Sequence, residues 1–337
     1  MEPLPAFHGL VGQRAPMRAL FARIQQIAPF DVSVLLVGET GTGKELVAAA
    51  LHRLSSRRSA RFEPVNCGAL SRELLRSELF GHERGAFTGA VERRTGLLRE
   101  ADGGTVFLDE VAELAPDAQA MLLRFLGDGE VRAVGASRAG HVDVRLIAAT
   151  HRDLRAAAGE GRFCDDLYYR LRRVVLTVPP LRARLDDLPL LVEHVRRLVT
   201  ARHGVSVTGV TDDALRHLAA YPWPGNVREL EAVLEEAMLF RGRGSLRAED
   251  LALPETVPAI PGPITSPASP VPGARSAETR RRLALELAAG DAGVSTGQLA
   301  RAAGVGLSLA RRELGVLVAR GDLSRTGRGR AVRYVRP

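Results

Sequence analysis

A glycine-rich turn between a predicted strand and a predicted helix constrains the fold of this chain more than any other feature. The β-branched run 32–37 ends at the turn, and an apolar helix, 45–54, begins after it. Glycines let backbone N–H groups point towards a phosphate chain, and the helix N-terminus adds its dipole. The spacing fits a P-loop through its lysine, which reaches the terminal phosphates. The predicted phosphate-binding residues are Gly38, Glu39, Thr40, Gly41, Thr42, Gly43, Lys44 and Glu45.

The choice of basic residues gives Lys44 special weight. Of the 47 basic residues, 46 are arginine and Lys44 is the single lysine. Ammonium and guanidinium groups differ in shape and donor geometry, so this lysine marks a position where arginine does not serve. A glycine-rich turn with a solvated lysine is the weaker alternative. Glu45 stands where many P-loops carry a hydroxyl residue, so Mg²⁺ must find a hydroxyl or water ligand elsewhere.

A second predicted strand supplies acidic groups. The apolar run 105–108 leads directly to Asp109 and Glu110. An aspartate at the carboxyl edge of a sheet can hold the Mg²⁺ shell of a nucleotide, and the neighbouring glutamate can polarise the attacking water. Acids that merely end a strand are common when they stand alone, but here a P-loop precedes them at domain-scale distance. Together the two motifs predict hydrolysis of a nucleoside triphosphate.

The pattern along the chain predicts an α/β domain followed by helices and a spacer. Up to residue 172, short β-rich runs alternate with helical patterns, as in a parallel sheet flanked by helices. From about Pro180 to Leu251 the pattern is helical throughout. Seven of the 19 prolines then lie between Pro254 and Pro272, which predicts a semi-stiff spacer.

The net charge of +8 is confined to the end of the chain. From Arg275 to Pro337 there are 13 arginines and 5 acidic residues, and the rest of the chain is neutral. Helices are expected at 277–289, 295–302 and 307–320, followed by a small β wing. A compact basic module indicates double-stranded DNA as a partner, and a solvated charged face or a protein-binding winged helix is the alternative. The predicted DNA contacts are Arg311, Arg312, Arg325, Arg328, Arg330 and Arg333.

Composition excludes several other classes. Two cysteines, Cys67 and Cys164, are too few for a disulfide framework, so we expect a reducing cytosol. No run of about 18 apolar residues is present and the N-terminus lacks a signal pattern, so we expect no membrane partner. The eight histidines have no partners at zinc spacing, which argues against a metal site built from protein ligands alone.

The most specific stretch of the sequence runs from Glu78 to Ala90. Its last six residues predict a thin tip that presents Phe87 and Thr88, and an exposed phenylalanine needs an apolar partner surface. A surface turn with Phe87 tucked into the core is the alternative. Here the chain resembles the AAA+ ATPase family of bacterial enhancer-binding proteins, the activators of sigma-54 RNA polymerase, over about residues 8–240. The resemblance implies a loop that contacts the sigma factor, made of Gly85, Ala86, Phe87, Thr88, Gly89 and Ala90.

Other stretches match the family position by position. Residues 103–110 resemble the family's Walker B segment, and 223–230 resemble its lid motif. The implied roles are restraint of the catalytic Glu110 by Asn66, the first sensor for Thr150, the second sensor for Arg228 and packing near the adenine for Val11.

The arginine-finger segment departs from the family pattern. Arg170 matches it and would complete the neighbouring subunit's site, since a guanidinium in trans stabilises charge on the transferring phosphoryl group. The family's first finger arginine is Cys164 here, and Arg162, two residues earlier, is a poor geometric substitute. We therefore expect slower or more weakly coupled hydrolysis.

The resemblance implies an AAA+ P-loop NTPase with a parallel sheet, a helical lid and a C-terminal winged-helix-like helix-turn-helix domain. The expected parts are an α/β ATPase core 1–178, a lid 179–252, a proline-rich linker 253–275 and a basic DNA-binding domain 276–337. No receiver or ligand-sensing domain is expected ahead of the ATPase, which leaves control in trans, by expression level or through the tail.

The function implied by the resemblance is activation of sigma-54-dependent transcription in the bacterial cytoplasm, at the nucleoid. A ring of subunits, expected to be a hexamer, would bind ATP and Mg²⁺ and remodel closed complexes of sigma-54 RNA polymerase holoenzyme into open ones. The basic tail would tether the ring to DNA upstream of the promoter. Two alternatives stay open: a AAA+ remodeller of another protein, and a DNA-binding regulator with a weakened ATPase.

Overall fold

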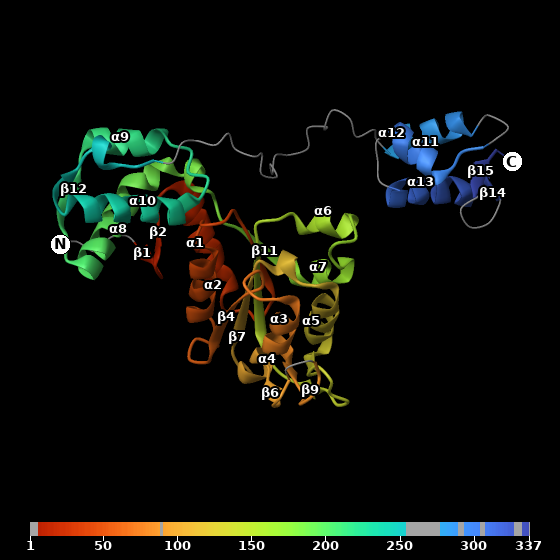
Figure 1. The fold of residues 1–337 in the computed structure, drawn as a ribbon, viewed down its shortest axis with the longest axis horizontal. Coiled ribbons are helices and arrows are strands. Elements are labelled where there is room, and N and C mark those ends of the chain that lie inside the picture. The colour runs from red at the N-terminus through yellow and green to blue at the C-terminus, as the bar shows by residue number, and fades with distance from the viewer. Residues whose placement is uncertain are drawn as a thin grey trace. The chain divides into compact units, whose positions relative to one another are not determined.

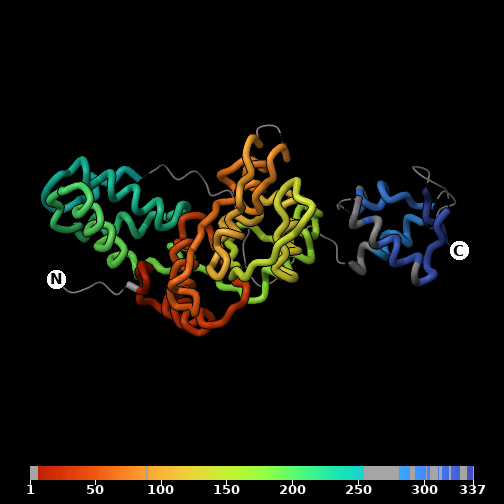
Figure 2. Tube along the Cα trace, turned by 90° about the horizontal axis from the view of Figure 1, so that it is seen from below, coloured from red at the N-terminus to blue at the C-terminus, as the bar shows by residue number. Residues whose placement is uncertain are grey.

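The computed structural model describes residues 6–87, 90–253, 277–288, 293–303, 307–326 and 332–336. The chain divides into two compact units, Met1–Pro263 and Ile264–Pro337 (Figure 1). The first unit contains a sheet domain and a lid. Figure 2 shows the lid, coloured green to teal, beside the red-to-yellow sheet domain.

A five-stranded sheet forms the centre of the first unit, and all its strands are parallel. Each strand is rich in β-branched or other apolar residues, as expected for strands covered on both faces. Parallel strands end at one edge, so residues that follow different strands come together there. In spatial order the strands are β11 (Val174–Thr177), β3 (Val34–Val37), β10 (Arg145–Thr150), β7 (Thr105–Asp109) and β4 (Phe62–Asn66).

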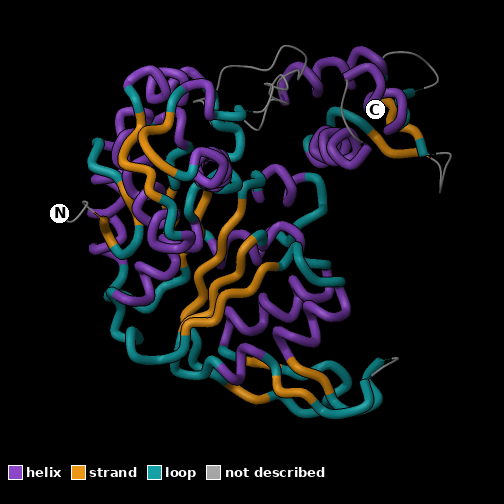
Figure 3. The backbone as a smooth tube through the Cα atoms, turned by 60° about the vertical axis from the view of Figure 1, so that its left-hand side comes forward, coloured by secondary structure: helices purple, strands orange, loops and turns teal. Residues whose placement is uncertain are grey.

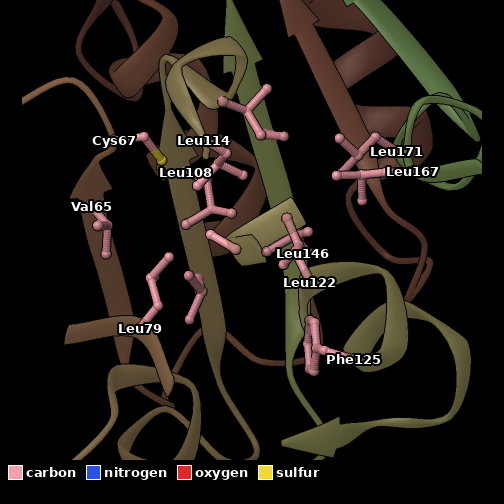
Figure 4. Packing of buried hydrophobic residues seen from close by; sticks show 14 of the residues in the cluster. Val65, Cys67, Leu79, Leu108, Leu114, Leu122, Phe125, Leu146, Leu167 and Leu171 are labelled. Atoms are coloured by element: carbon pink, nitrogen blue, oxygen red, sulfur yellow. The ribbon is translucent and has the colours of Figure 1, made fainter. Parts of the chain in front are cut away.

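The strands alternate their side chains between two buried layers, because successive residues of a strand point to opposite faces. Leu36 packs in one apolar cluster, whereas Leu35 packs in the other. Helices α1 (Ala15–Ile27) and α2 (Lys44–Arg53) contribute to the cluster of Leu36. Figure 4 shows side chains of the cluster on the opposite face. That face is covered by α3 (Arg72–Phe80), α4 (Leu97–Glu100), α5 (Pro116–Asp128), α6 (Leu154–Gly159) and α7 (Asp165–Leu171).

Two small antiparallel hairpins extend from the sheet domain (Figure 3). The first pairs β5 (Gly81–His82) with β6 (Arg94–Thr95), and the second pairs β8 (Glu130–Val131) with β9 (Gly140–His141). A bridge between His82 and Val134 joins them. The loop 85–90 therefore begins and ends on a hairpin that is held by its neighbour. At the N-terminus, β1 (Ala6–Phe7) pairs with β2 (Leu10–Val11).

The lid is built from helices α8 (Leu188–His203), α9 (Asp212–Ala220) and α10 (Asn226–Arg241), around a core that includes the fully buried Trp223. The expectation of a lid that is helical throughout is wrong in one respect. Strands β12 (Ser206–Val210) and β13 (Arg243–Leu246) form a parallel pair. Each strand is short and contains a glycine, and their pairing joins segments far apart in sequence, so no local periodicity indicates it. The first unit also contains short 3₁₀ turns, which are η1 (Val111–Glu113), η2 (Leu181–Ala183), η3 (Leu185–Asp187) and η4 (Ala248–Asp250).

The second unit contains α11 (Ala277–Leu287), α12 (Thr296–Ala303) and α13 (Leu307–Ala319), followed by the antiparallel pair β14 (Ser324–Thr326) and β15 (Arg333–Val335). The three helices predicted for the basic tail are confirmed within two residues at the ends that lie in described segments. Ser295 caps α12 as expected, since its hydroxyl accepts the N–H of Gln298 at 3.2 Å. Among the residues that the structure describes, no helix combines the length and apolar character needed to cross a membrane.

Candidate active site

The glycine-rich loop joins β3 to α2 as predicted, and its backbone conformation depends on glycine. Gly41 and Gly43 have φ of +78° and +96°, a region that residues with a side chain rarely occupy. Lys44, the first residue of α2, is only 7% exposed. Its Nζ donates to the carbonyl oxygens of Gly38 and Glu39, both at 3.0 Å. The loop therefore surrounds its lysine instead of leaving it solvated.

The electrostatics of Lys44 show which groups lie near it. Burial lowers the pKa of its ammonium group, Asp109 and Glu110 act in the opposite direction, and Arg228 adds to the lowering. Glu39 also acts to raise it. Three residues from the Walker B and lid motifs thus lie within electrostatic reach of the loop lysine, as the sequence predicts for a phosphate site.

Asp109 and Glu110 lie where β7 ends at the carboxyl edge of the sheet. Glu110 has a φ of +55°, which is strained for a residue with a side chain, and its N–H binds Oδ1 of Asp109 at 3.0 Å. Gly68 lies directly against the Glu110 carboxylate, since a Cβ added at residue 68 would lie 2.4 Å from Oε2. A side chain at residue 68 would therefore require the Glu110 carboxylate to shift. Sequence reasoning did not single out Gly68, and its type alone carried no signal.

Asn66 ends β4 directly beside Asp109 in the sheet register. Its Oδ1 accepts the N–H of Gly68 at 2.8 Å. Asn66 is therefore tied to the glycine that lies against Glu110, and the inferred restraint of Glu110 by Asn66 stays a prediction.

Thr150 ends β10 at the same edge and is 2% exposed. Its hydroxyl accepts the N–H of Arg152 at 2.9 Å and donates to the Arg152 carbonyl at 3.2 Å. Arg152 in turn pairs with Glu113 at 2.6 Å, just after the Walker B acids. The position at the sheet edge agrees with the expected sensor, whose role stays a prediction.

The lid helix α10 meets the glycine-rich loop directly. The N–H groups of Val227 and Arg228 donate to the Gly41 carbonyl at 3.0 and 3.3 Å. Asn226, which is fully buried and has a φ of +54°, donates from Nδ2 to the carbonyl of Thr40 at 3.0 Å. Sequence reasoning singled out Arg228 in this motif but missed Asn226, whose position between a glycine and a helix was the available signal.

Val11 lies in the short strand β2, packed against the lid cluster. Its carbonyl accepts Nη1 of the buried Arg184 at 3.3 Å. The buried Asp187 holds the next residues, because its Oδ1 accepts the N–H groups of Gln13 and Arg14 at 2.9 and 3.1 Å. The N-terminal segment is thus fixed where the lid begins, and its contact with an adenine stays a prediction.

The finger segment forms α7. Nη1 of Arg170, at the last turn, donates to the Leu126 carbonyl at 3.1 Å. Cys164 precedes the helix, with its N–H bound to Oε1 of Gln119 at 2.8 Å and its side chain half-buried against the apolar core. Arg162 forms an ion pair with Glu160, which gives its guanidinium a partner within its own chain.

The loop 85–90 differs from the expected exposed tip. The Gly85 N–H binds the Ala90 carbonyl at 2.8 Å and closes the loop. The ring of Phe87 is half-buried and lies edge-on to His82, with centroids 5.0 Å apart. His82 itself is fixed by a 2.7 Å hydrogen bond to Ser77. Phe87 is therefore partly tucked in, and the rest of the predicted tip, Thr88 and Gly89, lies outside the described residues.

The predicted DNA-contact residues are described only in part. Arg325 and Arg333 are exposed on β14 and β15. Arg333 donates to Oε1 of Gln298 at 2.7 Å. The side chains of Arg311 and Arg312, and the whole of Arg328 and Arg330, lie outside the described residues.

The residues present fit a nucleotide with its Mg²⁺. Asp109 lies within electrostatic reach of the buried Lys44, and two left-handed glycines shape the loop around that ammonium group. Among the described residues, no group of three or more His, Cys, Asp or Glu side chains could hold a metal ion. The Asp109 carboxylate would supply one ligand to a cation here, and a phosphate chain would supply others.

Comparison with known proteins agrees with this geometry. Residues 10–177 match the model of the sigma-54 interaction domain, and residues 182–257 match that of the AAA+ ATPase lid domain. The transcriptional regulatory protein ZraR of Salmonella typhimurium is 50% identical over 232 residues, which cover 69% of this chain and 53% of ZraR. The sigma54-dependent transcriptional activator SfnR of Pseudomonas putida is 47% identical over 236 residues, 70% of this chain and 64% of SfnR.

A solved structure extends the likeness to the fold. The crystal structure of NtrX from Brucella abortus in complex with ADP superposes with a TM-score of 0.67 at 33% identity, covering 91% of this chain and 68% of that chain. The chain thus spans about half to two thirds of the length of these relatives. It has the AAA+ P-loop NTPase fold, with a parallel sheet and a helical lid, and it belongs to the sigma-54 interaction domain family of transcriptional regulators.

Proposed function

We propose that this chain hydrolyses ATP and uses the energy to activate sigma-54-dependent transcription. The observation that carries the proposal is the convergence on one loop of Lys44, the acids Asp109 and Glu110, and Arg228 of the lid. NtrX has been solved in complex with ATP as well as ADP, and SfnR is named as a sigma54-dependent activator, which supports the same reading here.

Each group in the site has one task in this reaction. Backbone N–H groups of the glycine-rich loop and Lys44 hold the β- and γ-phosphates. Mg²⁺, held by Asp109 and the phosphates, would neutralise charge on the phosphoryl oxygens. Glu110 polarises the attacking water from its position at the end of β7, where its carboxylate lies against Gly68. Thr150 and Arg228 serve as sensors, and Asn66 restrains Glu110.

The active form is a ring, which we take to be a hexamer. Arg170 of one subunit would enter the site of its neighbour and stabilise charge in the transition state. In the single chain its guanidinium binds a carbonyl of α5. Cys164 contributes no second guanidinium, and Arg162 pairs with Glu160. Hydrolysis therefore depends on one finger arginine.

The loop 85–90 would contact sigma-54 within the polymerase holoenzyme and convert closed complexes into open ones. Phe87 supplies the apolar surface for this contact. Because its ring rests on His82, the contact requires the ring to leave that position. The aromatic contact is single and partly solvated, so its loss costs little, on the order of 1 kcal/mol.

The second unit would bind double-stranded DNA upstream of the promoter, at the nucleoid. Its three helices and antiparallel strand pair have the order of a winged helix, with α13 as the recognition helix. Arg325 and Arg333 lie exposed on the two strands, where they could contact phosphates. Charge neutralisation by several arginines makes such binding steeply salt-dependent. We also retain the division into core, lid, linker and DNA-binding domain at residues 178, 252 and 275.

A subunit-mixing experiment tests the ATPase. Lys44→Ala removes nucleotide binding in its own subunit, and Arg170→Ala removes the finger given to the neighbour. Each variant alone should be inactive, whereas their mixture should regain part of the ATPase rate, because some sites combine an intact Lys44 with an intact Arg170. A mixture that remains as inactive as either variant contradicts a finger acting in trans.

Open-complex formation tests the partner. Purified sigma-54 holoenzyme should melt a promoter carrying an upstream binding site only when the chain and hydrolysable ATP are both present. A Phe87→Ala variant should keep its ATPase rate and lose promoter melting. ATPase activity without any effect on the polymerase would favour a remodeller of another protein. Absence of ATPase activity would favour a DNA-binding regulator.

A further inference from the structure

The side chain of Glu39, within the glycine-rich loop, is bound by residues of the lid. Its carboxylate forms a two-point pair with Arg182, at the start of the lid, with Nη1 and Oε2 2.6 Å apart and Nη2 bound to Oε1. Oε2 also accepts Nδ2 of Asn226 at 3.2 Å. Glu39 lies within the phosphate-binding motif, but its charge is paired with an arginine of the lid.

Asn226 connects the same loop to the first turn of α10. It has no exposed surface, and every polar atom of its side chain has a partner. Nδ2 contacts Glu39 and the Thr40 carbonyl, while Oδ1 accepts the N–H of Leu181 at 2.8 Å. The left-handed backbone at Asn226, with φ +54°, is costly for a residue with a Cβ, so these bonds hold a strained position.

Gly41 completes the junction. Its carbonyl accepts two N–H groups from the first turn of α10, which have no partner within the helix. A Cβ at residue 41 would lie 2.1 Å from the Gly225 carbonyl oxygen, so loop and lid meet without space for a side chain. One of these two N–H donors belongs to Arg228, the residue whose charge acts on the Lys44 ammonium group.

Stability alone does not account for the Glu39–Arg182 pair. The side chains are 42% and 49% exposed, and ion pairs of that exposure contribute little to stability. A two-point carboxylate–guanidinium pair does fix orientation, because both groups are planar. Orientation is what the lid needs if Arg228 is to face the loop.

We propose that Glu39, Arg182 and Asn226 are positioning residues that hold the first turn of α10 on the phosphate-binding loop and so place Arg228 beside Lys44. The proposal rests on the nucleotide site proposed above and gives the Glu39 carboxylate a role in positioning the lid. A shift of the loop on nucleotide binding or release would move the lid through these three side chains.

Amide hydrogen exchange in the full chain without nucleotide tests the junction directly. In Glu39→Gln and in Arg182→Gln, the amides of Val227 and Arg228 should exchange about twofold to fivefold faster, as expected when an ion pair of this exposure is lost. The double variant should be no faster than either single variant, since both remove one interaction. Glu235→Gln is the matched control, because it removes from α10 an acidic group that pairs with Arg202 and His203 of α8 and leaves the glycine-rich loop untouched.

Nucleotide affinity gives a readout that a merely structural role would not move. If Arg228 is displaced from the terminal phosphates, ATP binding should weaken by a larger factor than ADP binding in both single variants. The proposal is overturned if the Val227 and Arg228 amides of Glu39→Gln exchange at the same rate as in the unaltered chain and the ratio of ATP to ADP affinity is unchanged. If Glu39→Gln does not fold, the exposed Arg182→Gln decides by the same two measurements. If the chain binds nucleotide but does not hydrolyse it, the proposed ATPase activity is refuted. The positioning role can still be judged, because neither measurement requires hydrolysis.

Discussion

Replacing Gly41 by alanine measures how much the junction between loop and lid contributes to stability. An alanine at φ +78° costs about 1–2 kcal/mol for its left-handed backbone. Its Cβ would also lie 2.1 Å from the Gly225 carbonyl oxygen and 3.1 Å from Cβ of Arg228, so the lid must move away. That movement breaks two backbone hydrogen bonds, worth about 0.5–1.5 kcal/mol each. The free energy of unfolding of the lid should fall by about 2–5 kcal/mol in total.

The chain carries its own probe for this measurement. Trp223 is the single tryptophan, is fully buried in the lid, and donates from Nε1 to the Leu218 carbonyl at 2.8 Å. Its fluorescence in a urea titration therefore follows unfolding of the lid and not of the second unit. The urea concentration at the midpoint of unfolding should be lower in Gly41→Ala than in the unaltered chain. The dependence of the unfolding free energy on urea concentration shows whether the two proteins unfold in the same transition.

Gly204→Ala provides the matched control. Gly204 has a φ of +69° at the end of α8, and a Cβ there would have no neighbour within 4 Å. This variant carries only the backbone cost, about 1–2 kcal/mol. The excess loss in Gly41→Ala, about 1–3 kcal/mol, belongs to the junction. Equal destabilisation in the two variants would refute the inference that loop and lid support each other.

Three further predictions address the cations and acids of the first unit. Lys44→Arg should weaken ATP binding in an equilibrium titration despite the conserved charge, and wild-type affinity would count against a shape requirement. Cys164→Arg should raise the steady-state ATPase rate by supplying the second guanidinium, and an unchanged or lower rate would contradict this. Arg196 and Arg197 hold the pKa of Glu193 at about 2, against its ordinary 4.5. Its ionised form therefore stabilises the lid above pH 4.5, and this contribution is lost as the pH falls towards 2; Glu193→Gln should flatten that part of the Trp223 unfolding profile.

The sequence predicts those parts of the site that are contiguous. The glycine-rich loop, the strand that ends at Asp109 and the helices of the lid each depend on residues within a few positions of one another. Periodicity and glycine spacing report such local order directly. The structure confirms the strand before the loop, the helix after it and the strand that ends at Asp109, with ends displaced by one or two residues.

The remaining features depend on contacts between distant segments. Glu39 and Asn226 are 187 positions apart, and nothing in the pattern of either segment indicates that they touch. Gly68 is placed against Glu110 by the pairing of β4 with β7, which brings the ends of two separate strands together. Phe87 differs for another reason: composition predicts an exposed tip, but the ring finds an aromatic neighbour in His82, a preceding residue of its own hairpin.

The single lysine and a nearby arginine show why the two cations are not exchangeable here. Lys44 is almost fully enclosed, and its ammonium group donates to two carbonyls at 3.0 Å, which leaves one of its three N–H donors for another acceptor. A guanidinium carries five N–H donors in one plane, and these two carbonyl oxygens are too few acceptors for them. Arg182 meets the opposite requirement, because its planar fork matches both oxygens of the Glu39 carboxylate. In the function proposed above, the loop presents a point charge to the phosphates through Lys44 and accepts a guanidinium fork from the lid through Glu39, which accounts for the one lysine in a chain that otherwise uses arginine.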